Sequence, residues 1–149
     1  FSCPPYGDLE VYSDDHRDLS NMEYDDFCEA YEKIISIASR KLKNNRFAVF
    51  VVGDIRDKKG FYRNFVDFTK ACFNKNGLLT YNELILLNVV GSVSRRAGSM
   101  FKNRKCGKCH QNVLVFYKGD PYKIKEYFAE VQVDEAFLNA AMAEDFLKY

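Results

Sequence analysis

An unbroken apolar run in the middle of the chain, RFAVFVVGD at residues 46–54, constrains the fold more than any other feature. The run is rich in β-branched side chains and has no alternation of polar and apolar residues, which is typical of a strand buried on both faces, as in parallel sheets. A sheet of that kind needs helices packed on it. The sequence therefore predicts an α/β protein.

Helical spacing of apolar residues appears on both sides of this strand. One helix is expected from Ser20, which forms a capping box with Glu23, to about Lys43. A second helix is expected over about 61–74. The apolar residues that define the two inner faces are Phe27, Tyr31, Ile34, Ile35, Ala38 and Leu42 in the first, and Tyr62, Phe65, Phe68 and Cys72 in the second.

Two more strands are expected, LLTYNELILLNVV at 78–90 and QNVLVFYKG at 111–119. No helical crossover is expected between them, so they should form an antiparallel pair across a long loop. The remaining 30 residues predict a helical tail, with a small docking helix over about 134–149. The predicted organisation is one domain over 1–119 and a tail over 120–149.

Charge is segregated although the net charge is only +1. Residues 8–32 carry acids with Arg17 as the sole arginine or lysine, whereas residues 84–119 contain no acid at all. The basic stretch predicts an anion-facing surface. No membrane-length apolar run and no signal peptide are visible, so we expect a cytoplasmic protein whose five cysteines are reduced.

The chain opens with FSCPPYGDLE. Two adjacent prolines cannot lie inside a strand or helix, because each removes a backbone donor and fixes φ. The segment therefore predicts a stiff kink. A rigid N-terminal arm, or a ligand for a proline-binding module, is the alternative interpretation.

Together, three segments resemble a known family. SCPPYGDLEVYSDD with DLSNMEYDDF resembles the start of the catalytic half of AdoMet-dependent DNA amino-methyltransferases, particularly phage-type DNA modification methylases. FAVFVVGDIRDKKGFYRNF and HQNVLVFYKG are similar to that family's central and final strands. The resemblance covers 1–119 and implies part of a Rossmann-like methyltransferase sheet. It also implies methyl transfer from AdoMet to the exocyclic amine of adenine or cytosine in DNA, in a bacterial or phage modification or restriction-modification system.

The resemblance assigns the catalytic motif to Cys3, Pro4, Pro5 and Tyr6. In that family the side chain at position 3 and the Pro4 carbonyl accept hydrogen bonds from the target amine, and Tyr6 stacks on a flipped base. Cys3 departs from the usual Asp, Asn or Ser, and sulfur is a weaker acceptor than oxygen.

Two further groups of site residues are predicted. Asp54 and Arg56 follow the buried strand, where ligands bind in open α/β sheets, and are expected to shape the base pocket. For Asp57, Lys58 and Lys59 an ordinary solvated connection is the better interpretation. The basic loop is expected to contact DNA phosphates through Arg95, Arg96, Lys102, Arg104, Lys105 and Lys108.

The pentapeptide CGKCH at 106–110 matches a haem-attachment pattern and half of a zinc site. No export signal and no second half-site accompany it, so no metal site is predicted.

A glycine-rich AdoMet turn is missing, because no two of the eight glycines are separated by a single residue. The family pattern places that turn in an N-terminal half, so AdoMet binding is expected to need such a half. That half, or a second copy of the chain, is the expected protein partner beside DNA. The alternative function is a catalytically inactive derivative that binds nucleic acid or a protein.

Overall fold

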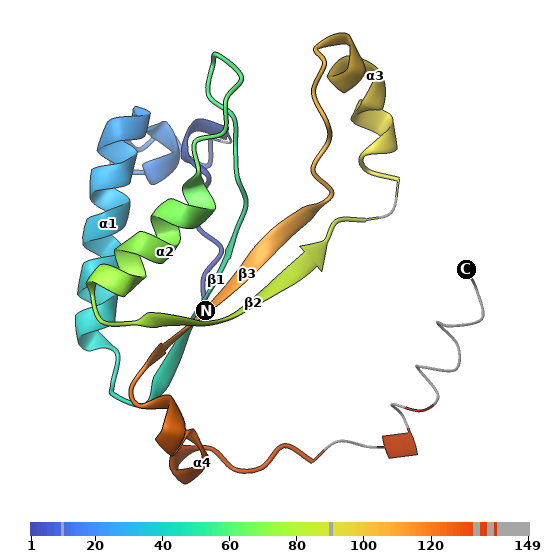
Figure 1. Cartoon of the computed structure of the whole chain (residues 1–149). Coiled ribbons are helices and arrows are strands. Elements are labelled where there is room, and N and C mark those ends of the chain that lie inside the picture. Colours follow the sequence, from blue (N-terminus) through green and yellow to red (C-terminus); the bar gives the residue numbers. More distant parts are fainter. Residues whose placement is uncertain (10, 90, 133–134, 137–138, 140–149) are drawn as a thin grey trace. The chain divides into compact units, whose positions relative to one another are not determined.

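The computed structural model describes residues 1–9, 11–89, 91–132, 135, 136 and 139. The chain divides into two compact units, Phe1–Gly119 and Asp120–Tyr149. The first unit contains, in chain order (Figure 1), η1 (Gly7–Leu9), η2 (Leu19–Asn21), α1 (Tyr24–Lys41), β1 (Arg46–Val52), α2 (Phe65–Lys75), β2 (Leu79–Leu87), α3 (Ser94–Lys102) and β3 (His110–Lys118).

The three strands form one sheet in the order β1-β3-β2, with both pairs antiparallel. The register aligns Val49 with Val115 across β1 and β3, and Leu84 with Val113 across β2 and β3. The α/β class and the antiparallel final pair are therefore confirmed. Parallel pairing is limited, among the described residues, to one bridge, in which the Ser2 amide donates to the Val49 carbonyl at 2.9 Å and the Val51 amide donates to the Ser2 carbonyl at 3.0 Å.

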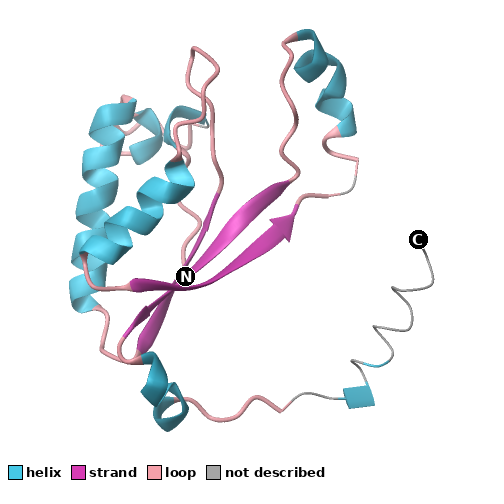
Figure 2. Ribbon diagram, in the orientation of Figure 1, coloured by secondary structure: helices cyan, strands magenta, loops and turns pink. Residues whose placement is uncertain are grey.

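Both long helices pack on the same face of the sheet (Figure 2). Phe27 and Tyr31 of α1 contact Phe65 of α2, with ring centroids 5.7 Å and 5.1 Å apart, and all three side chains are buried. Phe73 stacks on Phe116 of β3 at 4.0 Å. Each such side chain contributes about 1.5–3 kcal/mol by burial, so this aromatic layer holds α1 and α2 to the sheet.

The other face of the sheet has no helix of the described Phe1–Gly119 unit on it. Successive side chains of a strand point to opposite faces, so every second residue of the three strands lies on this face, away from α1 and α2. At one end, the rings of Phe47, Tyr81 and Tyr117 form a cluster with centroids 4.9–5.8 Å apart. At the other end, Leu84 and Leu86 are about half exposed, at 54% and 48%.

Several local expectations are corrected. The α1 helix begins at Tyr24 with no side-chain cap, and the predicted capping box does not form because Ser20 hydrogen-bonds to the Asp18 carboxylate instead. The α2 helix begins at Phe65, since Tyr62 pairs with Arg56 across the preceding turn. The long loop contains a helix, α3, that was not predicted.

The second unit begins with η3 (Pro121–Lys123) and α4 (Ile124–Tyr127). The Asp120 carboxylate accepts a hydrogen bond from the Tyr122 amide at 3.0 Å and so caps η3. The helix predicted over about 134–149 falls almost wholly on residues outside the described ones. Among the helices that the structure describes, none has the length and apolar character needed to span a bilayer.

Candidate functional site

The Pro-Pro segment follows directly on the Ser2 bridge to β1. Beyond the prolines, Tyr6 is half-buried, with its ring centroid 6.0 Å from that of Phe65 and its hydroxyl donating to the Val51 carbonyl at 3.4 Å. Gly7 then adopts a φ of 64°, which L side chains rarely adopt. The kink is thus fixed at both ends, by strand pairing before it and by a buried glycine turn after it.

A pocket of about 220 Å³ opens beside this kink, lined by Cys3, Pro4, Tyr6, Leu9, Tyr12 and Gln111. Three of the predicted catalytic residues therefore share one cavity. Pro5 is not among the lining residues. Gly53 lies close to two of the lining side chains, since a Cβ there would lie 3.6 Å from the Tyr6 ring and 3.9 Å from Cγ of Gln111.

Leu9, Tyr12 and Gln111 line the pocket without having been predicted as site residues, and of the three Gln111 is the one that lies far from the motif in sequence. It is the second residue of β3, and β3 runs antiparallel to β1. The start of β3 therefore lies at the carboxyl end of β1, the edge where ligands bind in open α/β sheets. The sequence predicted an antiparallel pairing of β3 with β2 only. An antiparallel pairing of β3 with β1 would also have placed Gln111 at this edge.

Asp54 and Arg56 make local contacts outside the pocket lining. An oxygen of the Asp54 carboxylate accepts from the Val66 amide at 3.1 Å and caps α2. The Arg56 guanidinium lies over the Tyr62 ring at 4.0 Å and donates to the Gly60 carbonyl. Their predicted role in shaping the base pocket stays a prediction.

The predicted DNA-contacting residues fall into two groups. Arg95, Arg96 and Lys102 lie on α3 and are exposed. Arg104, just after the helix, is exposed as well. Lys105 is half-buried and lies close to the Gly60 turn.

Lys108 belongs to a polar network rather than to the exposed group. Its Nζ is 3.7 Å from Oδ2 of Asp54 and 3.4 Å from Oδ1 of Asn112. The Asn112 amide in turn donates to Glu83 at 2.7 Å, and Lys70 donates to the other Glu83 oxygen at 2.8 Å. Lys70, with Asn112 adding to its effect, holds the pKa of Glu83 below its usual value.

An open groove of about 480 Å³ runs between the end of β2 and the start of α3. Its lining combines Leu86, Leu87 and Val89 with Arg95, Arg96 and again Gln111. No lining residue is acidic among those described. The groove therefore offers apolar and cationic surface together, which suits a polyanion that carries aromatic bases.

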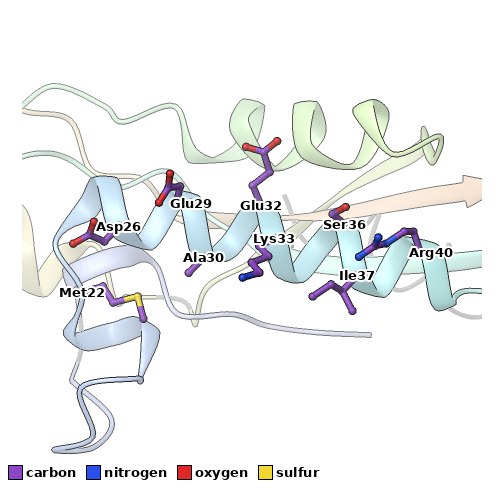
Figure 3. Close-up of a pocket in the computed structure, with 9 residues that line it drawn as sticks. All are labelled: Met22, Asp26, Glu29, Ala30, Glu32, Lys33, Ser36, Ile37 and Arg40. Atoms are coloured by element: carbon purple, nitrogen blue, oxygen red, sulfur yellow. The ribbon is translucent and has the colours of Figure 1, made fainter.

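A larger hollow, of about 740 Å³, lies elsewhere, along the exposed side of α1 (Figure 3). It mixes acids with Lys33 and Arg40, and Figure 3 shows Glu32 pointing away from Lys33 and Ile37. Glu32 is paired with Lys75 of α2. Its lining residues come almost entirely from the one helix, and among the described residues no three His, Cys, Asp or Glu side chains are grouped there to hold a metal ion, so we interpret it as a solvated helix face.

All five cysteines lie in the described part of the chain, and none is in a disulfide. Cys106 and Cys109 are exposed. Among the described residues, no three His, Cys, Asp or Glu side chains are grouped so as to hold a metal ion.

Neither a protein-family model nor a curated protein matches the sequence. Solved structures do match. TTHA0409 of Thermus thermophilus, described as a "Putative DNA Modification Methylase", matches in its complex with S-adenosyl-L-methionine at 15% identity and a TM-score of 0.53, over 97% of this chain and 54% of that one. Another structure of the same protein matches at 16% identity and a TM-score of 0.52, over 97% and 52%.

This likeness shows the fold. The chain shares the α/β fold of the Thermus thermophilus protein and spans about half of that protein's length.

Proposed function

We propose that this chain is the catalytic portion of an AdoMet-dependent DNA methyltransferase that modifies the exocyclic amine of adenine or cytosine. The observation that carries the proposal is the pocket at the carboxyl end of β1, where Cys3, Pro4 and Tyr6 converge. The shared fold supports it, as does the groove beside α3.

The chemistry follows from what these groups offer an amine. The lone pair of an exocyclic amine is delocalised into the ring, so the nitrogen is a poor nucleophile. Acceptors that bond its hydrogens favour the tetrahedral nitrogen that attack on a methyl group requires. The Pro4 carbonyl and the Cys3 sulfur are such acceptors, and the Tyr6 ring offers a stacking face for a base turned out of the duplex.

Tyr6 is well placed for this role. Its contacts with Phe65 and with the Val51 carbonyl hold the ring against the core, so that stacking a base on it costs little further ordering. The prolines hold the Pro4 carbonyl still in the same way, because their φ angles are already fixed.

The residues of this chain do not by themselves fit AdoMet. The cofactor would supply an electrophilic methyl group on sulfonium sulfur, and its amino-acid tail and ribose need a close backbone approach. The eight glycines include no Gly-x-Gly pair that would allow it. We assign cofactor binding to the part of the fold that this chain does not span, whether it lies on the same polypeptide or on another.

The outer edge of β1 supports this assignment. Ser2 is the residue that pairs with it there among those described. Beside it lies a mainly apolar groove of about 340 Å³, whose lining includes Phe1, Ile34, Leu42, Phe47, Phe50 and Leu78. A further parallel strand and its helices would cover both the backbone groups and the apolar side chains. A second copy of the chain is the alternative occupant.

A binding module without catalysis is the second candidate function. It is favoured by the absence of a Gly-x-Gly turn in a chain that retains the basic groove. Such a module would bind DNA through the groove and transfer no methyl group.

Calorimetric titration with AdoMet, followed by transfer of labelled methyl groups to unmethylated DNA, tests the proposal. The assay is run on the chain alone and with the AdoMet-binding portion of the fold added. We expect transfer only in the presence of a cofactor site, and loss of stacking in Tyr6→Ala should lower the rate by about ten-fold or more. Tyr6→Phe keeps the ring and should retain most of the activity.

Tyr122→Ala is the matched control, since Tyr122 is 95% exposed in the second unit. DNA binding without methyl transfer under either condition would favour the binding module. Equal losses of transfer and DNA binding in Tyr6→Ala would contradict a separate catalytic role for the ring.

A further inference from the structure

The pocket and the groove described above share one residue. Gln111 lines both the 220 Å³ pocket of Cys3, Pro4 and Tyr6 and the 480 Å³ groove beside α3. A nucleotide strand lying in the groove would therefore pass this side chain where one of its bases entered the pocket.

The geometry around Gln111 fixes its backbone and leaves its amide available. Its strand position pairs it with Leu86 of β2, and its Cγ and the Tyr6 ring would both lie within 4 Å of a Cβ placed on Gly53. The side chain is half-buried, and within the described part of the chain its amide has no hydrogen-bond partner. A half-buried amide that is otherwise unpaired is suited to bonding a ligand.

We propose that Gln111 is a positioning residue for the target base, and that the groove from Leu86 to Arg96 seats the nucleotides beside it. This inference rests on the proposed function. The Gln111 amide donates to the unprotonated ring nitrogen next to the target amine, which is N1 in adenine and N3 in cytosine. Guanine and thymine carry N–H at that position and a carbonyl in place of the amine, which would face the Pro4 carbonyl unfavourably.

The groove itself fits the flanking nucleotides. Arg95 and Arg96 supply two cations for phosphates, while Leu87 and Val89 are 72% and 79% exposed and offer apolar contacts for bases. The 84–119 segment contains no acid, so no carboxylate of that segment opposes a bound strand. Phosphate contacts hold the strand in place, and the base is read at Gln111.

The test uses short single-stranded oligonucleotides of thymidine that differ only at one central position. That position carries dA, dC or an abasic site, so the phosphate contacts are the same in each probe. Binding to the 149-residue chain is measured by fluorescence anisotropy. We expect dA or dC to bind about five-fold tighter than the abasic probe, the gain expected from a base contact together with one hydrogen bond.

Gln111→Leu keeps the side-chain volume and should remove much of this preference, while Gln111→Asn should retain part of it. The chain's other glutamine, Gln132, is exposed in the second unit, and Gln132→Leu is the matched control. Arg95→Ala with Arg96→Ala should weaken binding of all three probes to a similar extent. Near-ultraviolet circular dichroism verifies that each variant is folded.

The outcomes separate the inference from the function beneath it. Binding of all probes with a base preference that Gln111→Leu leaves unchanged overturns the role of Gln111 and leaves the proposed function standing. Binding of all probes with equal affinity would also overturn the role of Gln111 and leave the proposed function standing. If the folded chain binds none of the probes, DNA recognition by this portion is overturned, and the inference with it.

Discussion

The Lys108 ammonium lies 3.7 Å from the Asp54 carboxylate and ties the basic segment before β3 to the connection after β1. The same carboxylate caps α2 through the Val66 amide, so one acid holds a helix start and a loop at once. Two residues that were predicted for different sites are thus joined in one structural contact.

This contact distinguishes Lys108 from the other basic residues in a DNA-binding experiment. Lys102→Ala removes an exposed cation and should lower the slope of log binding constant against log salt by about one. Lys108→Ala should change that slope little and should instead lower the free energy of unfolding, because it removes a partner of both Asp54 and Asn112. Salt-dependent DNA titration and chemical denaturation of both variants measure this. Equal slopes for the two variants would show that Lys108 also contacts phosphate.

Gly7 ends the Pro-Pro kink, and its replacement by alanine should lower the free energy of unfolding. An added Cβ would lie 3.2 Å from Cδ2 of Tyr24 and 3.3 Å from Nη1 of Arg63, at a φ of 64°. Gly77 has a similar φ of 79° with no heavy atom of the described residues within 4 Å, so Gly77→Ala reports the backbone cost alone. We expect about 1 kcal/mol for Gly77→Ala and about 2 kcal/mol or more for Gly7→Ala in urea denaturation. Equal costs would mean that the surroundings of Gly7 adjust freely.

The core of the fold could be predicted because its signals are local. Phe27, Tyr31 and Ile35 recur at helical spacing and are all buried in α1. The α3 helix could not be found in this way, because none of its residues is buried and it therefore lacks a buried apolar face that the spacing could report. Its position depends on where β2 ends and where β3 begins, which the sequence does not reveal directly.

The candidate site was predictable to the extent that it lies in one segment. Cys3, Pro4 and Tyr6 are close in sequence, and their motif identified the pocket. Gln111 is far from them along the chain and enters the pocket only through the antiparallel register of β3. The sequence also does not show which acid a lysine of the basic segment pairs with, so the pairing of Lys108 with Asp54 could be found only from the three-dimensional structure.

Glu83 gives the sheet a defined response to acid. Its carboxylate accepts from Lys70 and Asn112, which hold its pKa below the ordinary value of 4.5. A group whose pKa is lower when folded stabilises the protein above its unfolded pKa and loses that contribution as the pH falls through the folded value. Stability should therefore decrease below about pH 4.5, and less steeply in Glu83→Gln. Denaturation midpoints between about pH 3 and pH 6 measure this, with Glu130→Gln as the exposed control; parallel curves for Glu83→Gln and the unsubstituted chain would contradict it.

The reactivity of the cysteine thiols tests the burial of each cysteine side chain. Cys3, Cys106 and Cys109 are exposed, whereas burial raises the pKa of Cys72 to about 11 and raises that of the half-buried Cys28. Because the thiolate is the reactive form, iodoacetamide at about pH 8 should modify the three exposed thiols first and Cys72 last, as followed by peptide mass spectrometry. Early labelling of Cys72 would show that its side of α2 opens readily.

The same reaction tests whether Cys3 lines a ligand site. With Cys106 and Cys109 changed to serine, N-ethylmaleimide should add chiefly to Cys3 and place a bulky group in the 220 Å³ pocket. We expect the modified chain to lose its preference for a central dA or dC over an abasic site while it keeps its affinity for the abasic probe, since the groove that binds phosphates remains open. The chain that also carries Cys3→Ser is the control, because the reagent should leave its binding unchanged. A base preference that survives modification of Cys3 would place the base outside this pocket.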